Sequence, residues 1–467
     1  MGKKHNVASK SHHGMIETLV SFISRTGFDD IPAHVTQLAK RSVIDWWGVT
    51  LGGSSHSVAS VLLKTIKELG GNRQATILGT DFKTSVYNAA LVNGAMSHVL
   101  DYDDTHLGAL MHPSAPLISA ILAYGEWKQK GGKDFLLSFV MGFEAETRIS
   151  VAMGASHYDR GWHSTSTMGR FGAASGIGKM IGLPRAEMAQ ALGLAGTQAS
   201  GIRRVFGTMT KSFHPGKAAA DGLLAAVLAQ NGYTAPVDIL EGDGGLGVCF
   251  STDFNAARGL EGLGERYMIE GISIKPYASC LYTHPVIDGV IRIRDREHIV
   301  PDDVAALTCD VSKFCHNAAC VPEPLTTGLE GKFSTSFCAA LALVEGRAGE
   351  DLFTNGKVED PFIRSLMEKV TVKRDDRLSD AEAVVTIRLR DGREIVERIN
   401  GPLGDPDHPL TDTQVEDKFR SLVSPFFETT KIDRILDRLR HMEDMENIGD
   451  LLPVSVIGDR EGTRDRS

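Results

Sequence analysis

The segment HVLDYDDTHLGALMHPSAP, residues 98–116, places histidines, aspartates and a threonine at spacings that could carry acid–base chemistry. If the preceding helix continues to about residue 102, three side chains fall at positions i, i+3 and i+7 of one helical face: His98, Asp101 and Thr105. We expect these side chains to converge on one pocket. The flanking residues are alanine, leucine, valine and isoleucine, so the ionisable groups lie at a junction between two buried helices.

The second half of this segment brings an imidazole to the start of the next helix. Pro113 suits the first helical position, which leaves His112 among the unpaired backbone N–H groups of the helix N-terminus. Because such a position disfavours a second positive charge, His112 is predicted to be a neutral base or hydrogen-bond partner. Asp103 and Asp104 lie at the same helix boundary, where carboxylates usually act as caps.

A metal site is the competing interpretation of these aspartates. The Asp-x-Asp-Asp order resembles the Mg²⁺-binding clusters of helical synthases, but no second acidic motif stands at a useful place in this half of the chain, and Mg²⁺ sites rely on substrate phosphates. The six cysteines include no C-x-x-C pair, which argues against a zinc ribbon or an iron–sulfur cluster. We therefore expect neither a metal nor another cofactor.

Three further clusters place cationic or proton-carrying side chains at a helix entrance. They are residues 155–169 with His157, Arg160 and His163, residues 205–222 with Lys211, His214 and Lys217, and the segment SIKPYASCLYTHP with Lys275, Cys280, Tyr282 and His284. Any one of them alone would more often be a capping loop than a site. Together with residues 98–116 they predict a pocket for a small, multiply charged anion.

The surrounding pattern predicts the elements that position these clusters. Apolar residues recur at three- and four-residue spacings up to about residue 267, which is typical of helices. Short β-like runs follow, two of them joined by the hairpin dipeptide Asp391-Gly392, and amphipathic helix returns near the C-terminus. We expect a mainly α fold: a large all-helical domain formed by N- and C-terminal segments (residues 14–270 with 405–455) and a smaller α+β lid domain (271–404). The polar residues past about 455 are expected to be disordered.

Composition excludes several classes of function. The net charge of −9 argues against a nucleic-acid binder, which needs a basic face. No stretch approaches the ~18 to 20 apolar residues that cross a bilayer, and no signal-peptide core follows the short basic start, MGKKH, which we interpret as a tag or tail. A cytoplasmic protein with reduced thiols and no membrane partner is therefore expected.

Five motifs of the chain resemble those of the MmgE/PrpD family, which includes 2-methylcitrate dehydratase, cis-aconitate decarboxylase and iminodisuccinate epimerase. In order, they are SHVLDYDDTH, RGWHSTSTMG, FGTMTKSFHPGKAA, IKPYASCLYTHP and EGKFSTSFCAALALVEG. The resemblance covers about residues 15–450. It implies a helical domain with an α+β lid, metal-free chemistry and commonly a homodimer. It also implies that the pocket holds Asp101, Thr105, His112, His163, Lys211 and Lys275.

Two positions depart from the pattern that the resemblance implies. The decarboxylase branch has an additional histidine five residues after the lid lysine, where this chain has Cys280. Many members have a tyrosine where this chain has Phe337. Both departures argue against decarboxylation without identifying the reaction that replaces it.

The chemistry common to these reactions is removal of a proton from carbon beside a carboxylate. We expect Lys211 and Lys275 to pair with substrate carboxylates, while His112 or His163 takes or returns the proton. Asp101 would orient an imidazole or a lysine, and Thr105 would donate a hydrogen bond. Further substrate contacts are expected from Cys280, Tyr282, His284 and His214.

The sequence thus predicts a metal-free hydro-lyase that dehydrates a small polycarboxylate such as 2-methylcitrate. The alternative is an epimerase of an aminodicarboxylate such as iminodisuccinate, because reprotonation on the opposite face would epimerise the same carbanion. A cis-aconitate-type decarboxylase and a non-catalytic polycarboxylate binder are the remaining interpretations.

Overall fold

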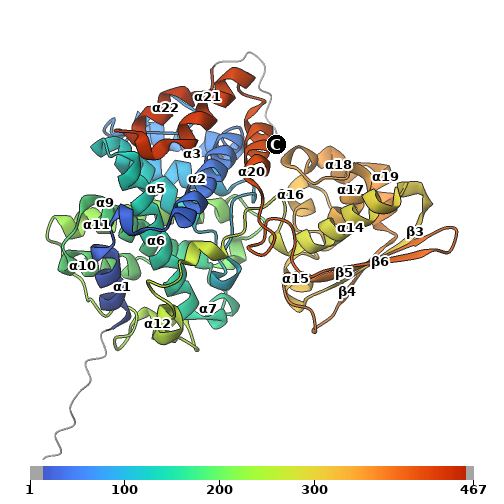
Figure 1. Ribbon diagram of the computed structural model, residues 1–467, viewed down its shortest axis with the longest axis horizontal. Coiled ribbons are helices and arrows are strands. Elements are labelled where there is room, and N and C mark those ends of the chain that lie inside the picture. The colour runs from blue at the N-terminus through green and yellow to red at the C-terminus, as the bar shows by residue number, and fades with distance from the viewer. Residues whose placement is uncertain (1–13, 459–467) are drawn as a thin grey trace, which may run out of the picture.

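The structure, a computed structural model, describes residues 14–458 and shows a large helical body with a smaller α+β unit at one side (Figure 1). The basic start MGKKH and residues 459–467 of the polar tail lie outside the described residues. The expectation of disorder past residue 455 is wrong for 456–458, because the backbone N–H of Ile457 donates to the carbonyl of Gly79 at 2.8 Å. No helix in the described part of the chain is both long and apolar enough to span a lipid bilayer.

The helical body comes from both ends of the chain. Its N-terminal helices are α1 (Met15–Arg25), α2 (Ala33–Gly53), α3 (Ser57–Leu69), α4 (Val86–His98), α5 (Ser114–Lys128), α6 (Gly132–Met153), α7 (Ala155–Asp159), α8 (Ser164–Thr167), α9 (Gly169–Ile181), α10 (Arg185–Thr197), α11 (Thr210–Gln230), α12 (Leu246–Phe250) and α13 (Ala256–Leu260). A two-stranded ribbon, β1 (Ala75–Thr76) with β2 (Lys83–Thr84), interrupts them. The C-terminal helices are α20 (Asp412–Val423), α21 (Thr429–Arg440) and α22 (Leu451–Val454).

The close approach of α4 and α11 explains part of the glycine content of the body. A Cβ atom on Gly94 would lie 2.7 Å from the Cα of Gly216, and one on Gly216 would lie 2.2 Å from the carbonyl oxygen of Leu91. Only glycine therefore permits this separation of the two backbones. The contact matters for the site, because the loop after α4 and the first turn of α11 carry several of the predicted pocket residues.

The C-terminal segment packs back on the body through α20, which lies along α2 (Figure 1). The ammonium group of Lys418 in α20 is buried 2.6 Å from the carboxylate of Asp45 in α2, and it donates to the carbonyl of Tyr102 at 2.7 Å. The chain end thus fixes the loop that follows α4. The helical body thus combines N- and C-terminal segments, as the sequence predicts, but the β1–β2 ribbon means that it is not all-helical.

The α+β unit contains a four-stranded sheet in the order β4-β3-β5-β6. The strands are β3 (Val304–Val311), β4 (Val370–Arg374), β5 (Ala383–Leu389) and β6 (Glu394–Ile399). The helices of this unit are α14 (His284–Glu297), α15 (Lys313–Ala318), α16 (Gly328–Gly331), α17 (Thr335–Glu345), α18 (Asn355–Glu359) and α19 (Pro361–Met367). Strand β3 is parallel to β4 and antiparallel to β5, which pairs antiparallel with β6.

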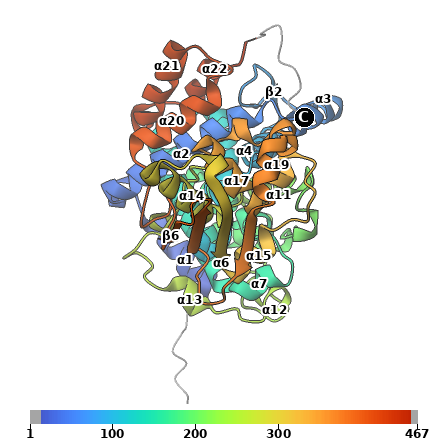
Figure 2. The same ribbon diagram turned by 90° about the vertical axis from the view of Figure 1, so that its right-hand side faces the viewer.

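The predicted hairpin at Asp391-Gly392 joins β5 to β6, and Gly392 has the positive φ of 93° that such a turn requires. Helices α14 and α17 pack together and against the sheet. Figure 2 turns this unit toward the viewer, with its strands and helices in front of the helical body. The fold is mainly α with a small α+β unit, as the sequence predicts.

Candidate active site

A cavity of about 1360 Å³ lies between the helical body and the α+β unit. Its walls include the loop from α4 to α5, the first turn of α11, the loop before α14, and residues of α15, α16 and α18. The predicted site residues that line it are Asp101, Thr105, His112, His163, Lys211, Lys275, Cys280 and Tyr282. His214 and His284 do not belong to the lining.

The loop after α4 has a backbone conformation that the helical spacing did not predict. Helix α4 ends at His98, so the prediction that His98, Asp101 and Thr105 share one helical face is wrong. Asp101 adopts φ = 52°, in the left-handed region that non-glycine residues enter only when their surroundings hold them there. This turn sends Asp101 and Thr105 into the cavity wall and leaves His98 behind it.

Asp101 joins the two lysines that were expected to bind substrate. Its Oδ1 lies 2.5 Å from Lys211 Nζ and 3.7 Å from Lys275 Nζ, which also donates to the Asp101 carbonyl at 2.7 Å. Burial would raise the pKa of Asp101, but the two ammonium groups outweigh it and hold that pKa far below its usual value. Burial would likewise lower the pKa of Lys211, but Asp101 raises it. Two cations and one anion therefore share this wall.

Thr105 offers an unused hydroxyl beside these charges. Its backbone pairs with Ser273, with N–H···O distances of 2.9 and 2.7 Å in the two directions. This pairing ties the loop after α4 to the segment that carries Lys275. The hydroxyls of Thr105 and Ser273 are both buried, and neither has a hydrogen-bond partner within residues 14–458. Thr105 can therefore donate to a ligand in the cavity.

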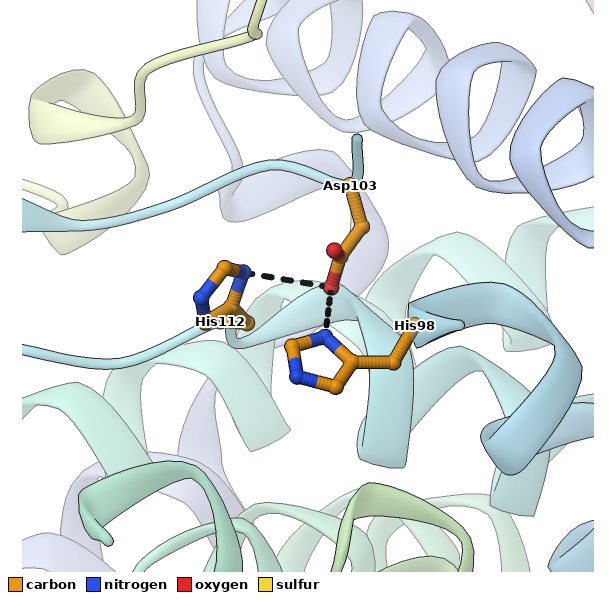
Figure 3. A group of neighbouring side chains, drawn as sticks. All are labelled: His98, Asp103 and His112. Carbon is orange, nitrogen blue, oxygen red and sulfur yellow. Dashed lines mark hydrogen bonds and ion pairs between the residues drawn. The ribbon is translucent and has the colours of Figure 1, made fainter. Parts of the chain in front are cut away.

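Asp103 bridges two imidazoles with one oxygen (Figure 3). Its Oδ2 lies 2.8 Å from His98 Nδ1 and 3.2 Å from His112 Nδ1. Burial would raise the pKa of Asp103, but His98 and His112 hold it well below its usual value. Burial lowers the pKa of His98 to about 4, so that imidazole is neutral at pH 7. With Nδ1 directed to the carboxylate, the ring nitrogen that His112 keeps for proton transfer is Nε2.

The same three side chains could be considered as metal ligands. Their candidate ligand atoms lie within 4.8 Å of one another, and no other such group occurs among the described residues. The 2.8 Å separation of Asp103 Oδ2 and His98 Nδ1 is that of a charge-assisted hydrogen bond, whereas two ligands about 2.0 Å from one tetrahedral zinc would lie farther apart. The Asp103–His98 contact thus fits a hydrogen bond, and the Nδ1 atom of His112 lies 3.2 Å from the same oxygen as an ion-pair contact.

Asp104, unlike Asp103, acts as the predicted cap. It accepts hydrogen bonds from the backbone N–H of Ser114 at 3.3 Å and from the Ser114 hydroxyl, at the first turn of α5. The capping interpretation is confirmed for Asp104 and wrong for Asp103. Because Asp104 occupies the start of α5, His112 lies just before a helix terminus that already has an acidic partner.

His163 and His214 form a second imidazole pair, with 2.9 Å between their Nδ1 atoms. Burial and the neighbouring His98 lower the pKa of His163 well below its usual value, and burial lowers that of His214 to about 4. Both rings are therefore neutral at pH 7. His163 faces the cavity, whereas His214 supports it from behind.

The remaining predicted residues divide between the cavity and the protein interior. Burial raises the pKa of the Cys280 thiol to about 11 and that of the Tyr282 phenol well above its usual value, so both groups are neutral donors in the cavity wall. His284 is fully buried and its Nε2 lies 3.3 Å from the carbonyl of Ser279, away from the cavity. His157 lies 2.8 Å from the hydroxyl of Thr167 and is also buried.

Sequence reasoning missed two cations of the cavity. Lys332 is buried between the carbonyl of Leu100 at 2.5 Å and the carboxylate of Glu350 at 2.6 Å, and it lies in the EGKFSTSF motif without having been singled out. Arg203 lies in a short 3-10 turn, Arg203–Val205, directly before the TMTKSFH motif. The one feature of the sequence that could have drawn attention to Arg203 is the pair of arginines between Gly201 and Gly207, in a segment rich in apolar residues.

The chain is a mainly α protein with an α+β unit beside its helical body and a cavity between them that lysines and imidazoles line. Comparison with known families identifies its class more closely. The model of the MmgE/PrpD N-terminal domain matches residues 17–258, and that of the MmgE/PrpD C-terminal domain matches residues 277–443. The chain belongs to the MmgE/PrpD family.

Its curated relatives match it over most of their length. A cis-aconitate decarboxylase of Aspergillus terreus is 27% identical, with 96% of this chain and 97% of the relative covered. The cis-aconitate decarboxylase of Homo sapiens is 25% identical, with 89% of each chain covered. A mitochondrial 2-methylcitrate dehydratase of Yarrowia lipolytica is 23% identical over 77% of this chain and 74% of the relative. Decarboxylases and dehydratases are both lyases, so the family comparison supports a lyase.

Proposed function

We propose that this protein is a lyase that moves a proton at a carbon beside a carboxylate of a small polycarboxylate, with dehydration of a 2-methylcitrate-like acid as its reaction. One observation carries the proposal: His112, which has Asp103 behind it, and the Lys211–Asp101–Lys275 group line one cavity. The first supplies a proton acceptor. The second supplies positive charge for the carbanion that forms.

His112 is the proton acceptor in this scheme. Its Nε2 takes the proton from carbon, and the imidazolium that results is stabilised by the Asp103 carboxylate at 3.2 Å. The electron pair left on carbon delocalises into the neighbouring carboxylate, which becomes a dianion. In the dehydration, this electron pair then forms the double bond as the β-hydroxyl leaves. His112 returns its proton to the departing hydroxyl, which becomes water.

The lysines meet the charge of the dianion. Asp101 raises the pKa of Lys211, and this carboxylate, shared by the ammonium groups of Lys211 and Lys275, leaves one net positive charge on the wall for a substrate carboxylate. Preorganised cations in a partly dry cavity stabilise such charge more effectively than water does. The free hydroxyl of Thr105 and the neutral His163 provide hydrogen bonds at the same wall.

Decarboxylation is the second candidate, because the decarboxylases named above have higher identity and longer coverage than the dehydratase. In that reaction the bond from carbon to a carboxylate breaks, carbon dioxide leaves, and His112 delivers a proton to carbon. The thiol of Cys280, at the position where the decarboxylase branch is expected to carry a histidine, argues against decarboxylation.

The test is incubation of the purified protein in D₂O with citrate, 2-methylcitrate, cis-aconitate and iminodisuccinate, followed by proton NMR. The proposal predicts loss of 2-methylcitrate with appearance of an alkene product. Consumption of cis-aconitate with release of carbon dioxide would establish the second candidate. Deuterium exchange without net conversion would instead indicate an epimerase, and no change with any of the acids would contradict a lyase of this class.

A further inference from the structure

Arg203 is a cavity cation for which residues 14–458 provide no anionic partner. Its guanidinium carbon lies 3.9 Å from the ring centroid of Tyr158, and its Nε is buried with no hydrogen-bond partner in the described part of the chain. No described carboxylate forms an ion pair with it, including that of Asp159, which also lines the cavity. A buried guanidinium nitrogen without an acceptor is costly unless a ligand supplies one.

The lysines of the cavity differ from Arg203 in this respect. Lys211 and Lys275 share Asp101, and Lys332 pairs with Glu350 at 2.6 Å. The Lys211–Asp101–Lys275 group retains a single net positive charge, which suits one carboxylate. A substrate with two carboxylates therefore needs a second cation, and Arg203 is a cavity cation that no carboxylate of the described residues neutralises.

The position of Arg203 connects it to the reacting end of the cavity. Three residues later, the ring of Phe206 lies 5.4 Å from Lys211 Nζ and 4.9 Å from the His163 ring. The turn that carries Arg203 is therefore adjacent to Lys211. Arg203 nevertheless stacks on a different wall, at Tyr158.

The wall at Tyr158 is formed jointly by the helical body and the α+β unit. The Tyr158 ring lies 5.7 Å from Phe314 of α15, and the Phe314 ring lies 5.0 Å from Tyr282. These aromatic rings shield one side of the guanidinium from water, which strengthens any charge-assisted hydrogen bond made there. Stacking also restricts the planar guanidinium, whose N–H groups can bind a carboxylate in a fork geometry.

We propose that Arg203, held against Tyr158, forms a second carboxylate subsite that makes the cavity selective for dicarboxylates and tricarboxylates over monocarboxylates. The inference rests on the proposed function for the identity of the ligand class and adds the residue that selects it. One carboxylate binds at the Lys211–Asp101–Lys275 wall. A second, remote from the reacting carbon, accepts hydrogen bonds from Arg203.

The experiment compares the binding of succinate and butyrate, two four-carbon acids that differ in one carboxylate, by isothermal titration calorimetry. The proteins are the wild type, Arg203→Gln, Arg203→Lys and Arg204→Gln. Arg204 is the matched control, because it is adjacent and exposed and does not line the cavity. We expect Arg203→Gln to weaken succinate binding by about 10- to 100-fold, the effect of a lost charge-assisted contact, and to leave butyrate binding unchanged.

Arg204→Gln should bind both acids as the wild type does, and Arg203→Lys should show a smaller loss for succinate alone, because it keeps the charge without the fork. Thermal melting of each variant reports whether it folds. If Arg203→Gln does not fold, the succinate affinity of Arg203→Lys tests whether Arg203 forms the second carboxylate subsite. Equal losses for both acids, unchanged succinate binding in the Arg203 variants, or a wild type that does not prefer succinate would each overturn the subsite. Intact succinate preference without any turnover in the NMR assay would refute only the proposed function.

Discussion

The ammonium group of Lys211 lies 2.5 Å from the carboxylate of Asp101, although the two residues are 110 positions apart in the chain. The pair forms because α4 and α11 approach closely at Gly94 and Gly216, which brings the loop after one helix to the first turn of the other. The close packing of these two helix backbones therefore determines which charged side chains meet at the cavity wall.

Replacing Lys211 by alanine tests the charge of this wall. Without Lys211, Asp101 retains only Lys275 at 3.7 Å, and the wall loses its net positive charge. We expect turnover to fall by at least about 10²-fold, the range seen when a preorganised donor to a developing anion is removed. Lys217→Ala is the control, because Lys217 pairs with Asp221 on α11 and does not line the cavity. Near-normal turnover in Lys211→Ala would exclude a role in stabilising the anion.

Replacing Asp103 by asparagine separates orientation from charge. The amide oxygen can still accept from an imidazole, but it no longer stabilises the imidazolium of His112. We therefore expect kcat to fall by about 10² to 10⁴-fold, with little change in the affinity for succinate. Loss of substrate affinity at unchanged kcat would contradict this assignment.

The same variant has a predicted pH signature in stability. Because the folded-state pKa of Asp103 is depressed, its stabilising contribution is present above the unfolded value of about 3.9 and is lost as pH falls toward the folded-state pKa. Asp103→Asn should be less stable than the wild type at pH 7, by about 1 to 3 kcal/mol, and this difference should shrink below pH 4, roughly the unfolded-state value. Urea unfolding at the two pH values measures it, and a pH-independent difference would contradict the depressed pKa.

His163 and His157 provide a matched comparison of two buried histidines near the same helix. His163→Gln should keep a normal melting temperature and lose at least about 10²-fold in turnover, because its ring faces the cavity beside His98 and Lys211. His157 lies outside the cavity and its Nε2 lies 2.8 Å from the Thr167 hydroxyl, so His157→Gln should lower stability and spare turnover. Thermal melting measures the stability of each variant, and NMR measures its turnover. A His157→Gln protein that loses turnover, or a His163→Gln protein that loses only stability, would contradict these assignments.

The sequence predicted the helical body and the sheet because periodicity and the Asp391-Gly392 turn are local signals. It also singled out eight of the residues that line the cavity, since clusters of ionisable groups at helix entrances are visible in the chain. It could not show that α4 stops at His98, because the left-handed turn at Asp101 is held by tertiary contacts such as those of Lys275 and Lys418. Arg203 was missed for a similar reason, since the absence of an anionic partner is a property of the folded chain alone.

Glu146 is predicted to make the stability of the folded protein depend on pH, with no role in catalysis. It is fully buried in α6, and neither carboxylate oxygen has a hydrogen-bond partner among the described residues. Burial, together with the nearby carboxyl of Asp104, raises the pKa of Glu146 well above its usual value. The folded state therefore retains a proton that the unfolded state releases, so the contribution of this group to stability is favourable below the unfolded pKa of about 4.3 and is lost as pH rises through the folded-state pKa.

Glu146→Gln should then be more stable than the wild type at pH 8 and about equally stable at pH 4, roughly the unfolded-state pKa. Between these limits the difference in the free energy of unfolding should grow by up to about 1.4 kcal/mol per pH unit until the folded-state pKa is passed. Glu144→Gln is the control on the same helix, because Glu144 lies 2.7 Å from the buried guanidinium of Arg148 and its loss should destabilise the protein by about 1 to 3 kcal/mol at pH 8. Urea unfolding across this pH range measures the difference in the free energy of unfolding. A Glu146→Gln protein that is less stable than the wild type at pH 8 would show that Glu146 is ionised and has a partner in the folded state.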